Sequence, residues 1–371
     1  MGDVIDVLVA GGGPAGLATA IHAALAGLEV VVVEPRSSPV DKACGEGLMP
    51  SGVAALRAMG VEPYGRPLHG IEYLDSRRRA RATFSPGTGA GVGLGVRRTV
   101  LHAALSRRAA DLGVTTVTGR ITAARQDEKG VEAQLTRPPA GDLQAHRGEE
   151  TRSREEWRTG GGMRARWLVA ADGLHSPLRE ALGLALPYAG QRRYGLRRHY
   201  EIAPWTDFVE VHWSGTGEAY VTPVGDDLVG VAVLSSRRCG FDEHLAAFPD
   251  LRARLDAPPA TPVRGAGPMR QRVRARVAGR VLLVGDAAGY TDALTGEGIS
   301  LAVLSAKALV GCLTKGRPAD YERAWRRLSL AHRLLTGALL HAARRPGTAS
   351  LVVPAAHHLP ALFTGAVRAL S

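Results

Sequence analysis

The sequence predicts an α/β fold: a three-layer, Rossmann-type domain that carries an inserted, mostly antiparallel β-sheet and is followed by C-terminal helices. Three observations predict it. Residues 5–10 and 30–33 are short apolar runs rich in β-branched side chains, typical of buried parallel strands. Residues 11–16 read Gly-Gly-Gly-Pro-Ala-Gly and satisfy the G-x-G-x-x-G spacing ahead of a helical pattern. Four alternating stretches between residues 192 and 235, separated by turn signals, indicate an antiparallel sheet.

The glycine-rich turn indicates dinucleotide binding because each glycine has its own physical task. Gly11 permits a tight turn, Gly13 lets the backbone approach a pyrophosphate, and Gly16 lets the helix lie close to the strand. Unpaired N–H groups at the helix start face the anion. Glu34, about 20 residues downstream, is placed to accept hydrogen bonds from an adenosine ribose. The other residues that we assign to this part of the site are Pro14, Ala15 and Arg36.

Length and composition are those of a globular chain with room for two joined domains. The chain has 371 residues, of which 45% are hydrophobic, and a mean hydropathy of −0.04. No apolar run approaches the roughly 18–20 residues of a membrane span, and Met1-Gly2-Asp3 leads directly into the first strand, so we expect neither an integral membrane segment nor a secretory leader. Cys44, Cys239 and Cys312 lack a C-x-x-C spacing, which predicts no disulfide framework and no metal site. We expect a cytoplasmic protein.

The formal charge of +12 raises the question of an anionic partner. Four of the 47 basic residues are lysines, so 43 are arginines, a skew that is typical of genome composition rather than of a binding face. The basic residues are scattered and are not interleaved with aromatic residues, which argues against nucleic-acid binding. An anionic substrate and peripheral contact with a membrane surface both stay open.

Two further segments are predicted to press against a flat or charged group. Gly45, Glu46 and Gly47 form a small, flexible segment that permits close backbone packing, and we interpret the preceding Cys44 as a small buried side chain. Arg98 stands at the start of a predicted helix. Because a cation there opposes the helix dipole, we expect Arg98 to face an anion.

The remaining elements follow from local patterns. Residues 68–75 and 79–84 are expected to be half-exposed antiparallel strands, and residues 138–162 a flexible loop without a site. The last two helices are expected to cover the core, with a membrane-surface anchor as the alternative. Other predicted strands cover 114–117, 121–135, 165–171, 263–270 and 281–284; predicted helices begin near Pro50, Arg98 and Gly296 and cover 241–255, 321–344 and 352–370.

Three motifs follow one another along the chain: Gly11–Gly16 with Glu34; Asp172-Gly173 with Ser176 and Arg179; and Gly285-Asp286-Ala287-Ala288 with Gly296-x-Gly298. In this order they resemble the motifs of one family, the FAD-dependent oxidoreductases built like para-hydroxybenzoate hydroxylase, which include geranylgeranyl reductases and flavin-dependent halogenases. The resemblance implies bound FAD, with Arg98 reaching toward the phosphates and the Asp286 carboxylate contacting the ribityl chain.

The resemblance also implies a role for the helix that is predicted to begin at Gly296. Its free N–H groups, near Gly298 and Ile299, would point toward the flavin pyrimidine edge and stabilise negative charge when the ring is reduced. The sequence holds no second G-x-G-x-x-G, so we expect NAD(P)H to visit the flavin transiently or a separate electron donor to reduce it. The expected division is an FAD-binding domain (1–66, 95–185 and 271–315), a substrate-binding sheet (67–94 and 186–270) and a C-terminal helical segment (316–371).

Departures from the family pattern bear on the reaction. Aromatic hydroxylases usually follow Gly-Asp-Ala-Ala with His and a Pro pair, whereas this chain has Gly289-Tyr290-Thr291. The segments Cys44–Gly47 and Gly296–Ile299 look more like the geranylgeranyl reductase branch, although residues 218–223 lack the tryptophan expected there. The halogenase Trp-x-Trp-x-Ile-Pro segment is absent, and Leu68-His69 stands where the halogenase lysine would fall.

Our first expectation is an NAD(P)H-using FAD monooxygenase that hydroxylates or epoxidises a small, largely apolar metabolite. The alternative is an FAD-dependent carbon–carbon double-bond reductase of prenyl-type substrates, and a third reading is a flavoprotein without catalysis. We assign no catalytic base, because alternation does not say which strand residues face inward. The candidates are His69, His199, His212, Tyr200 and Tyr220.

Overall fold

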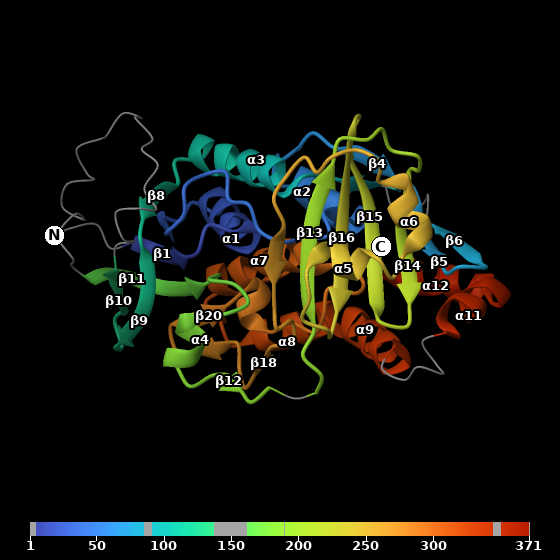
Figure 1. Ribbon diagram of the computed structural model, residues 1–371. Helices are drawn as coiled ribbons and strands as arrows, with labels where there is room; N and C mark the ends of the chain where they lie inside the picture. Colours follow the sequence, from blue (N-terminus) through green and yellow to red (C-terminus); the bar gives the residue numbers. More distant parts are fainter. Residues whose placement is uncertain (1–4, 85–90, 137–161, 189, 344–349, 371) are drawn as a thin grey trace.

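The computed structural model describes residues 5–84, 91–136, 162–188, 190–343 and 350–370. Two large sheets lie side by side, and helices cover the first sheet and one end of the second (Figure 1). The predicted α/β fold with a parallel, nucleotide-binding type of sheet and a second, mostly antiparallel sheet is confirmed. The predicted loop 138–162 lies outside the described residues except for Gly162, the first residue of a strand.

The first sheet is parallel at its centre because its strands are buried, β-branched segments. It has the order β19-β20-β11-β1-β2-β8, and a β9–β10 hairpin pairs antiparallel with β11. All pairs from β20 to β8 are parallel, which brings their carboxyl ends to one edge. The strands are β1 Ile5–Ala10, β2 Val30–Glu34, β8 Thr115–Thr118, β9 Arg120–Gln126, β10 Val131–Thr136, β11 Gly162–Ala170, β19 Val277–Ala278 and β20 Val281–Leu283.

Helices from distant parts of the chain pack on this sheet. Helix α1 contacts α3 and α7, and α7 also contacts α2 and α8. The bounds are α1 Pro14–Leu25, α2 Pro50–Arg57, α3 Arg98–Asp111, α4 Pro177–Ala181, α7 Gly298–Thr314 and α8 Asp320–Leu328, with a 3₁₀ turn, η4, at Gly285–Ala288. Helix α7 begins two residues later than predicted, because Gly296 has a left-handed φ of +70° that no helix accommodates.

The second sheet has the order β17-β13-β16-β15-β14-β5-β6. Strands β14, β15 and β16 form the predicted meander, but β13 pairs with β16 rather than β14, and β14 pairs parallel with β5. The strands are β5 Gly70–Leu74, β6 Arg79–Thr83, β13 Tyr194–Tyr200, β14 Phe208–Ser214, β15 Gly217–Gly225, β16 Leu228–Ser235 and β17 Arg264–Ala266. Small sheets join β3 Gly47–Leu48, β4 Arg66–Leu68 and β7 Gly93–Gly95, and pair β12 Ala185–Leu186 with β18 Arg272–Val273.

Two expectations about the second sheet are wrong. Strand β5 is buried along its whole length rather than half-exposed, because its polar face is covered as well: the Glu72 carboxylate is 3.4 Å from the Arg81 guanidinium. The predicted helix 241–255 is two short helices, α5 Phe241–Leu245 and α6 Pro249–Arg254, because Pro249 does not extend the preceding helix.

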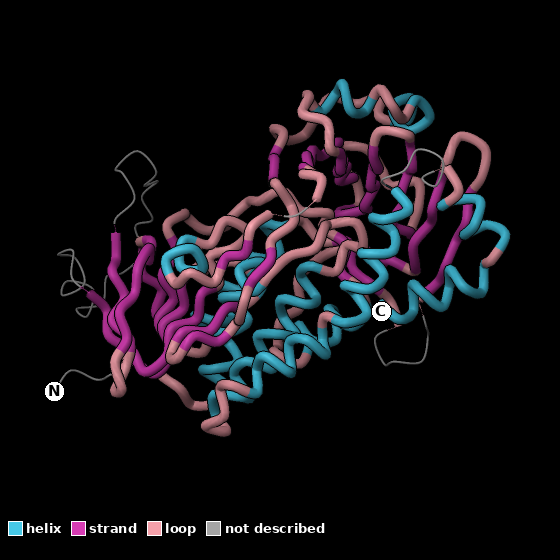
Figure 2. The backbone as a smooth tube through the Cα atoms, turned by 90° about the horizontal axis from the view of Figure 1, so that it is seen from below, coloured by secondary structure: helices cyan, strands magenta, loops and turns pink. Residues whose placement is uncertain are grey.

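The C-terminal segment folds into more helices than predicted. The predicted helix 321–344 divides at Ser329 into α8 and α9 (Leu330–Ala343), and the predicted helix 352–370 divides before Pro360 into α11 (Val352–His358) and α12 (Pro360–Leu370). Figure 2 shows these helices along one side of the molecule. Helix α11 packs on β5 and β6 and α12 on β6, and residues of α9, α11 and α12 share a hydrophobic cluster with these strands, whereas α8 packs on α7. No helix in the described ranges is long and apolar enough to cross a membrane. The division into domains stays a prediction.

Candidate cofactor and substrate site

One cavity of about 760 Å³ runs from the carboxyl ends of β1 and β2 to the second sheet and the C-terminal helices. All the residues assigned from the sequence line it except Gly16. They are Gly11, Gly13, Pro14, Ala15, Glu34, Arg36, Gly45, Glu46, Gly47, Arg98, Asp172, Gly173, Gly285, Asp286, Gly296, Gly298 and Ile299. We call the part that they line the nucleotide end. Segments far apart in the sequence therefore meet at one place.

The glycine-rich turn has the close contacts that its sequence predicts. Gly11 has a φ of +106°, and a Cβ there would lie 2.5 Å from the Ala171 carbonyl oxygen. A Cβ on Gly16 would overlap the Gly11 carbonyl oxygen, so Gly16 acts by letting α1 approach β1. Gly13 precedes the first turn of α1, and the Arg98 guanidinium lies close to it. A helix start and a cation thus converge where a pyrophosphate would lie.

Glu34 is held in a fixed orientation at the end of β2. Its Oε2 accepts a hydrogen bond from the Gly12 N–H at 2.7 Å, and its Oε1 accepts one from Arg36 Nε at 2.7 Å. The carboxylate is buried, whereas the Arg36 side chain is half-exposed. This anchoring presents an acid at the site's edge, as a ribose-binding residue requires.

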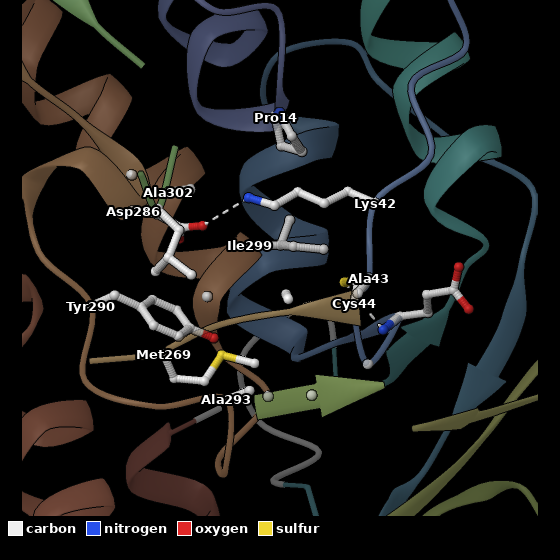
Figure 3. Close-up of a pocket in the computed structure, with 18 of the residues that line it drawn as sticks. Pro14, Lys42, Ala43, Cys44, Met269, Asp286, Tyr290, Ala293, Ile299 and Ala302 are labelled. Carbon is white, nitrogen blue, oxygen red and sulfur yellow. Dashed lines mark hydrogen bonds and ion pairs between the residues drawn. The ribbon is translucent and has the colours of Figure 1, made fainter. Parts of the chain in front are cut away.

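A buried arginine joins the second motif to the third. Arg179, only 1% exposed, donates hydrogen bonds to the carbonyl oxygens of Leu174 at 2.8 Å and of Ala287 at 3.3 Å. It thereby fixes η4, on which the Asp286 carboxylate lies 3.4 Å from Lys42 Nζ. Figure 3 shows Lys42 and Asp286 extending toward each other. Lys42 is a neighbour of Asp286 that the sequence motifs do not reveal.

The Cys44–Gly47 segment is held in place by hydrogen bonds of Glu46, one of them to His199, which does not line the cavity. Glu46 takes a left-handed φ of +60°, unusual for a residue with a side chain. Its Oε1 accepts a hydrogen bond from the Arg98 N–H at 2.8 Å, and its Oε2 lies 2.6 Å from His199 Nε2. Arg197 Nη1 donates to His199 Nδ1 at 3.0 Å, so the imidazole proton is on Nε2 and is donated to Glu46. Glu46 therefore positions Arg98 and its own loop.

The turn before α7 presents backbone donors and a buried polar cluster. Gly296, Gly298 and Ile299 line the cavity, and the first turn of α7 leaves N–H groups without intrahelical partners. The Glu297 side chain points the other way, with Oε2 at 3.3 Å from His332 Nδ1 of α9. Burial raises the pKa of the Glu297 carboxyl above its usual value. His332, which pattern analysis did not identify, links this turn to α9.

The far part of the cavity, the substrate end, has apolar walls. Six elements form it: β5, β14, β15, β16, α9 and α12. Among its polar groups, the Tyr220 hydroxyl donates to the Leu294 carbonyl oxygen at 2.8 Å, and none of the described residues that these elements contribute is charged. They are Ile71, Tyr73, Val209, Val211, Tyr220, Thr222, Ala232, Leu234, Leu335, Ala338, Leu339, Leu362, Phe363, Ala366 and Val367.

The five His and Tyr candidates separate clearly. Tyr220 lines the cavity, and His199 is buried beside Glu46 without lining it. Tyr200 belongs to a separate cluster with Phe241. The remaining two, His69 and His212, lie outside the cavity next to Asp207 and Glu210.

The nucleotide end fits FAD on two kinds of observation. Its glycines provide a cradle that side chains would fill, as at Gly11. Two buried polar atoms on its wall, Arg98 Nε and Asp172 Oδ1, have no hydrogen-bond partner within the described part of the chain. A diphosphate and a hydroxylated linker would supply the missing acceptor and donor.

Comparisons with known proteins agree with this geometry. Residues 4–215, more than half of the chain, match the model of the family described as FAD binding domain. Several relatives are reductases by name, and two of them illustrate the match. Menaquinone reductase of Mycolicibacterium smegmatis is 29% identical, with 88% of this chain and 80% of the relative covered. Digeranylgeranylglycerophospholipid reductase 1 of Methanothermobacter thermautotrophicus is 29% identical, with 86% and 81% covered.

Two further matches show the breadth of the family. Rifampicin monooxygenase of Streptomyces venezuelae is 27% identical, with 82% of this chain and 62% of the relative covered. The structure of the flavin-dependent brominase Bmp2 superimposes with a TM-score of 0.77 at 18% identity, covering 99% of this chain and 93% of that one. At that identity the likeness is one of fold. The chain belongs to the FAD binding domain family and is an FAD-dependent oxidoreductase.

Proposed function

We propose that this protein is an FAD-dependent reductase of carbon–carbon double bonds in a prenyl-type lipid. The observation that carries the proposal is the substrate end, which is continuous with the nucleotide end and is walled by apolar side chains, four of them from α12. A long hydrocarbon chain has no polar groups that lose hydrogen bonds to water when it enters such a space. A charged or strongly polar substrate would be buried there with its own polar groups unpaired.

Two similarities support the proposal. The relatives named as acting on menaquinone and on digeranylgeranylglycerophospholipid match most of this chain. The Cys44–Gly47 and Gly296–Ile299 segments, which pointed to the reductase branch, both line the cavity. Because of these two findings, we propose the reductase reaction rather than the monooxygenase reaction that we first expected from the motifs.

The residues of this chain would bind and orient the groups that react. Gly13 and Arg98 would hold the pyrophosphate, Glu34 the ribose, and Asp286 with Lys42 the ribityl chain. The N–H groups at the start of α7 would balance negative charge at the ring edge. Bound and reduced, FAD supplies a hydride to an acceptor.

Reduction of a double bond also needs a proton, and we propose that the Tyr290 hydroxyl supplies it. Tyr290 and Cys44 both line the cavity beside Gly298 and Ile299 (Figure 3). Burial raises the pKa of each group, so each stays protonated at neutral pH. Cys44 Sγ accepts a hydrogen bond from the Glu46 N–H at 3.3 Å, and its S–H is a weaker donor than a phenolic hydroxyl, so we assign the proton to Tyr290.

The test is turnover without oxygen. We expect the FAD-loaded protein, kept reduced by dithionite under anaerobic conditions, to convert a prenyl alcohol, which has no other reducible group, to a product heavier by two hydrogen atoms. Mass spectrometry identifies the product. A strict requirement for O₂, together with a product that contains one added oxygen atom, would contradict the proposal.

That second outcome would establish the monooxygenase, our second candidate. It is supported by the similarity to rifampicin monooxygenase and by the dry walls of the substrate end. In either case we propose NAD(P)H or a separate flavin-reducing protein as the electron source. Anaerobic addition of NADH or NADPH to the yellow protein distinguishes the two: bleaching by a nicotinamide identifies the direct donor.

A further inference from the structure

We infer that the face formed by α9, α11 and α12 docks on an anionic membrane surface and places the cavity mouth against the lipid. We call it the C-terminal face. The inference rests on the proposed function, because it names the source of the lipid substrate.

Exposed large apolar side chains gather on this part of the molecule. The described chain has nine of them, and six follow residue 327. Leu330 and Leu334 are one helical turn apart on α9, and Leu362 on α12 is 69% exposed. The other three are Leu328, Leu351 and Leu359. Single exposed leucines are ordinary, but a concentration on adjacent helices indicates an interaction surface.

Residues 323–371, which include the C-terminal face, contain basic but no acidic side chains. All 35 Asp and Glu residues of the chain lie at or before Glu322, whereas residues 323–371 contain seven arginines. Arg333 on α9 and Arg368 on α12 are exposed on the same helices as the exposed leucines Leu334 and Leu362. Helices with apolar and basic exposed residues and no acidic ones bind anionic bilayer surfaces, because lipid headgroups attract the arginines while the leucines enter the interface.

The cavity opens on this face. Leu362 and Ala338 line the cavity and are exposed at the same time, so the substrate end has an opening between α12 and α9. The two helices pack against each other and against α11. A lipid could therefore pass from the bilayer into the substrate end without crossing water.

A second copy of the chain fits the C-terminal face less well than an anionic membrane does. A symmetric dimer brings the same patch of each subunit together, so arginines would face arginines without an acidic partner between residues 323 and 371. An anionic bilayer supplies the missing negative charge.

The test is co-sedimentation of the FAD-loaded protein with vesicles of phosphatidylcholine alone and with vesicles in which phosphatidylglycerol replaces part of it. We expect binding to the anionic vesicles at low salt and weak binding to the neutral ones. The double variant Leu334→Gln, Leu362→Gln should lower the affinity about tenfold, and Arg333→Gln, Arg368→Gln should lower it to a similar extent for anionic vesicles alone. Leu25→Gln, a substitution of an exposed leucine on α1, is the matched control and should bind like the parent.

Three outcomes would overturn the inference: no binding of the parent protein to anionic vesicles, equal binding by the leucine variant and the parent, or a dimer that this variant converts to a monomer. Circular dichroism and FAD content confirm that each variant is folded. The assay involves no turnover. If the protein reduces a detergent-dispersed substrate but does not bind vesicles, only this inference is contradicted. If it binds vesicles but does not reduce the substrate, only the proposed function is contradicted.

Discussion

The two ends of the cavity are built on different principles. At the nucleotide end, glycines, helix starts and paired charges fix the backbone: Gly16 touches Gly11, Glu34 is held by two donors, and Arg179 joins two motifs. At the substrate end, apolar side chains from four adjacent strands of the second sheet and from two helices meet with few hydrogen bonds. The difference indicates that backbone geometry defines the proposed cofactor site, whereas shape and apolar walls define the proposed substrate site.

The comparison predicts that Gly16→Val has the largest effect. The added side chain would overlap the Gly11 carbonyl oxygen and press on Ala171, so α1 must leave β1 and the pyrophosphate site must open. We expect FAD affinity to fall by more than about a hundredfold, measured as flavin absorbance per protein. Gly311→Ala on α7, where an added Cβ meets nothing within 4 Å, is the control and should retain FAD. Full FAD content in the Gly16 variant would contradict the account of this end.

The second prediction concerns a substitution at the substrate end that leaves the nucleotide end intact. Ala366→Asp places a carboxylate on the apolar wall of the substrate end, where it finds no partner. We expect kcat/KM for a detergent-dispersed prenyl substrate to fall about a hundredfold while FAD stays bound. Ala369→Asp, at an exposed α12 position that does not line the cavity, should retain activity. Equal losses in both variants would show that α12 does not form the wall.

A third change tests the junction of the two ends. Tyr290→Phe removes the proposed proton donor, so we expect kcat to fall tenfold or more, in line with the typical contribution of about 10²–10⁴ from general acid catalysis. The rate of flavin reduction should not change. Stopped-flow absorbance separates the two steps, and Cys44→Ala is the comparison. A normal rate in the tyrosine variant with a loss in the cysteine variant would assign the proton to Cys44.

The smallest expected effect concerns Glu297, which lies between the ends. Burial raises the pKa of this carboxyl in the folded state, so folding favours the protonated form, and stability is lost as pH rises through the raised pKa. Glu297→Gln should therefore raise the free energy of unfolding by about 1 kcal/mol at pH 8 and by little at pH 4. Urea denaturation at both pH values measures it, and Glu62→Gln, at an exposed position, should change neither. A loss of stability at pH 8 would mean that the His332 contact outweighs burial.

Sequence reasoning succeeded where the determinants are local. The turn at Gly11–Gly16 and the acid at the end of β2 are specified by neighbouring residues, so spacing alone located them. It failed where distant segments decide, since β13 pairs with β16 across the sheet. It also missed the helix breaks at Ser329 and before Pro360, although a proline is a local signal for such a break. The same limit hid the cavity wall, because the amphipathic pattern of α9 and α12 does not say which surface their apolar sides meet.

The proposed reductase is tested most directly by a single turnover. Reduced, FAD-loaded protein is mixed anaerobically with a prenyl alcohol, whose double bonds are its only reducible groups, and the visible absorbance of the oxidised flavin is followed. The account predicts that the yellow colour returns without oxygen and that the acceptor gains two hydrogen atoms in proportion. A flavin that stays bleached until O₂ is admitted, with the acceptor then carrying an added oxygen atom, would contradict it.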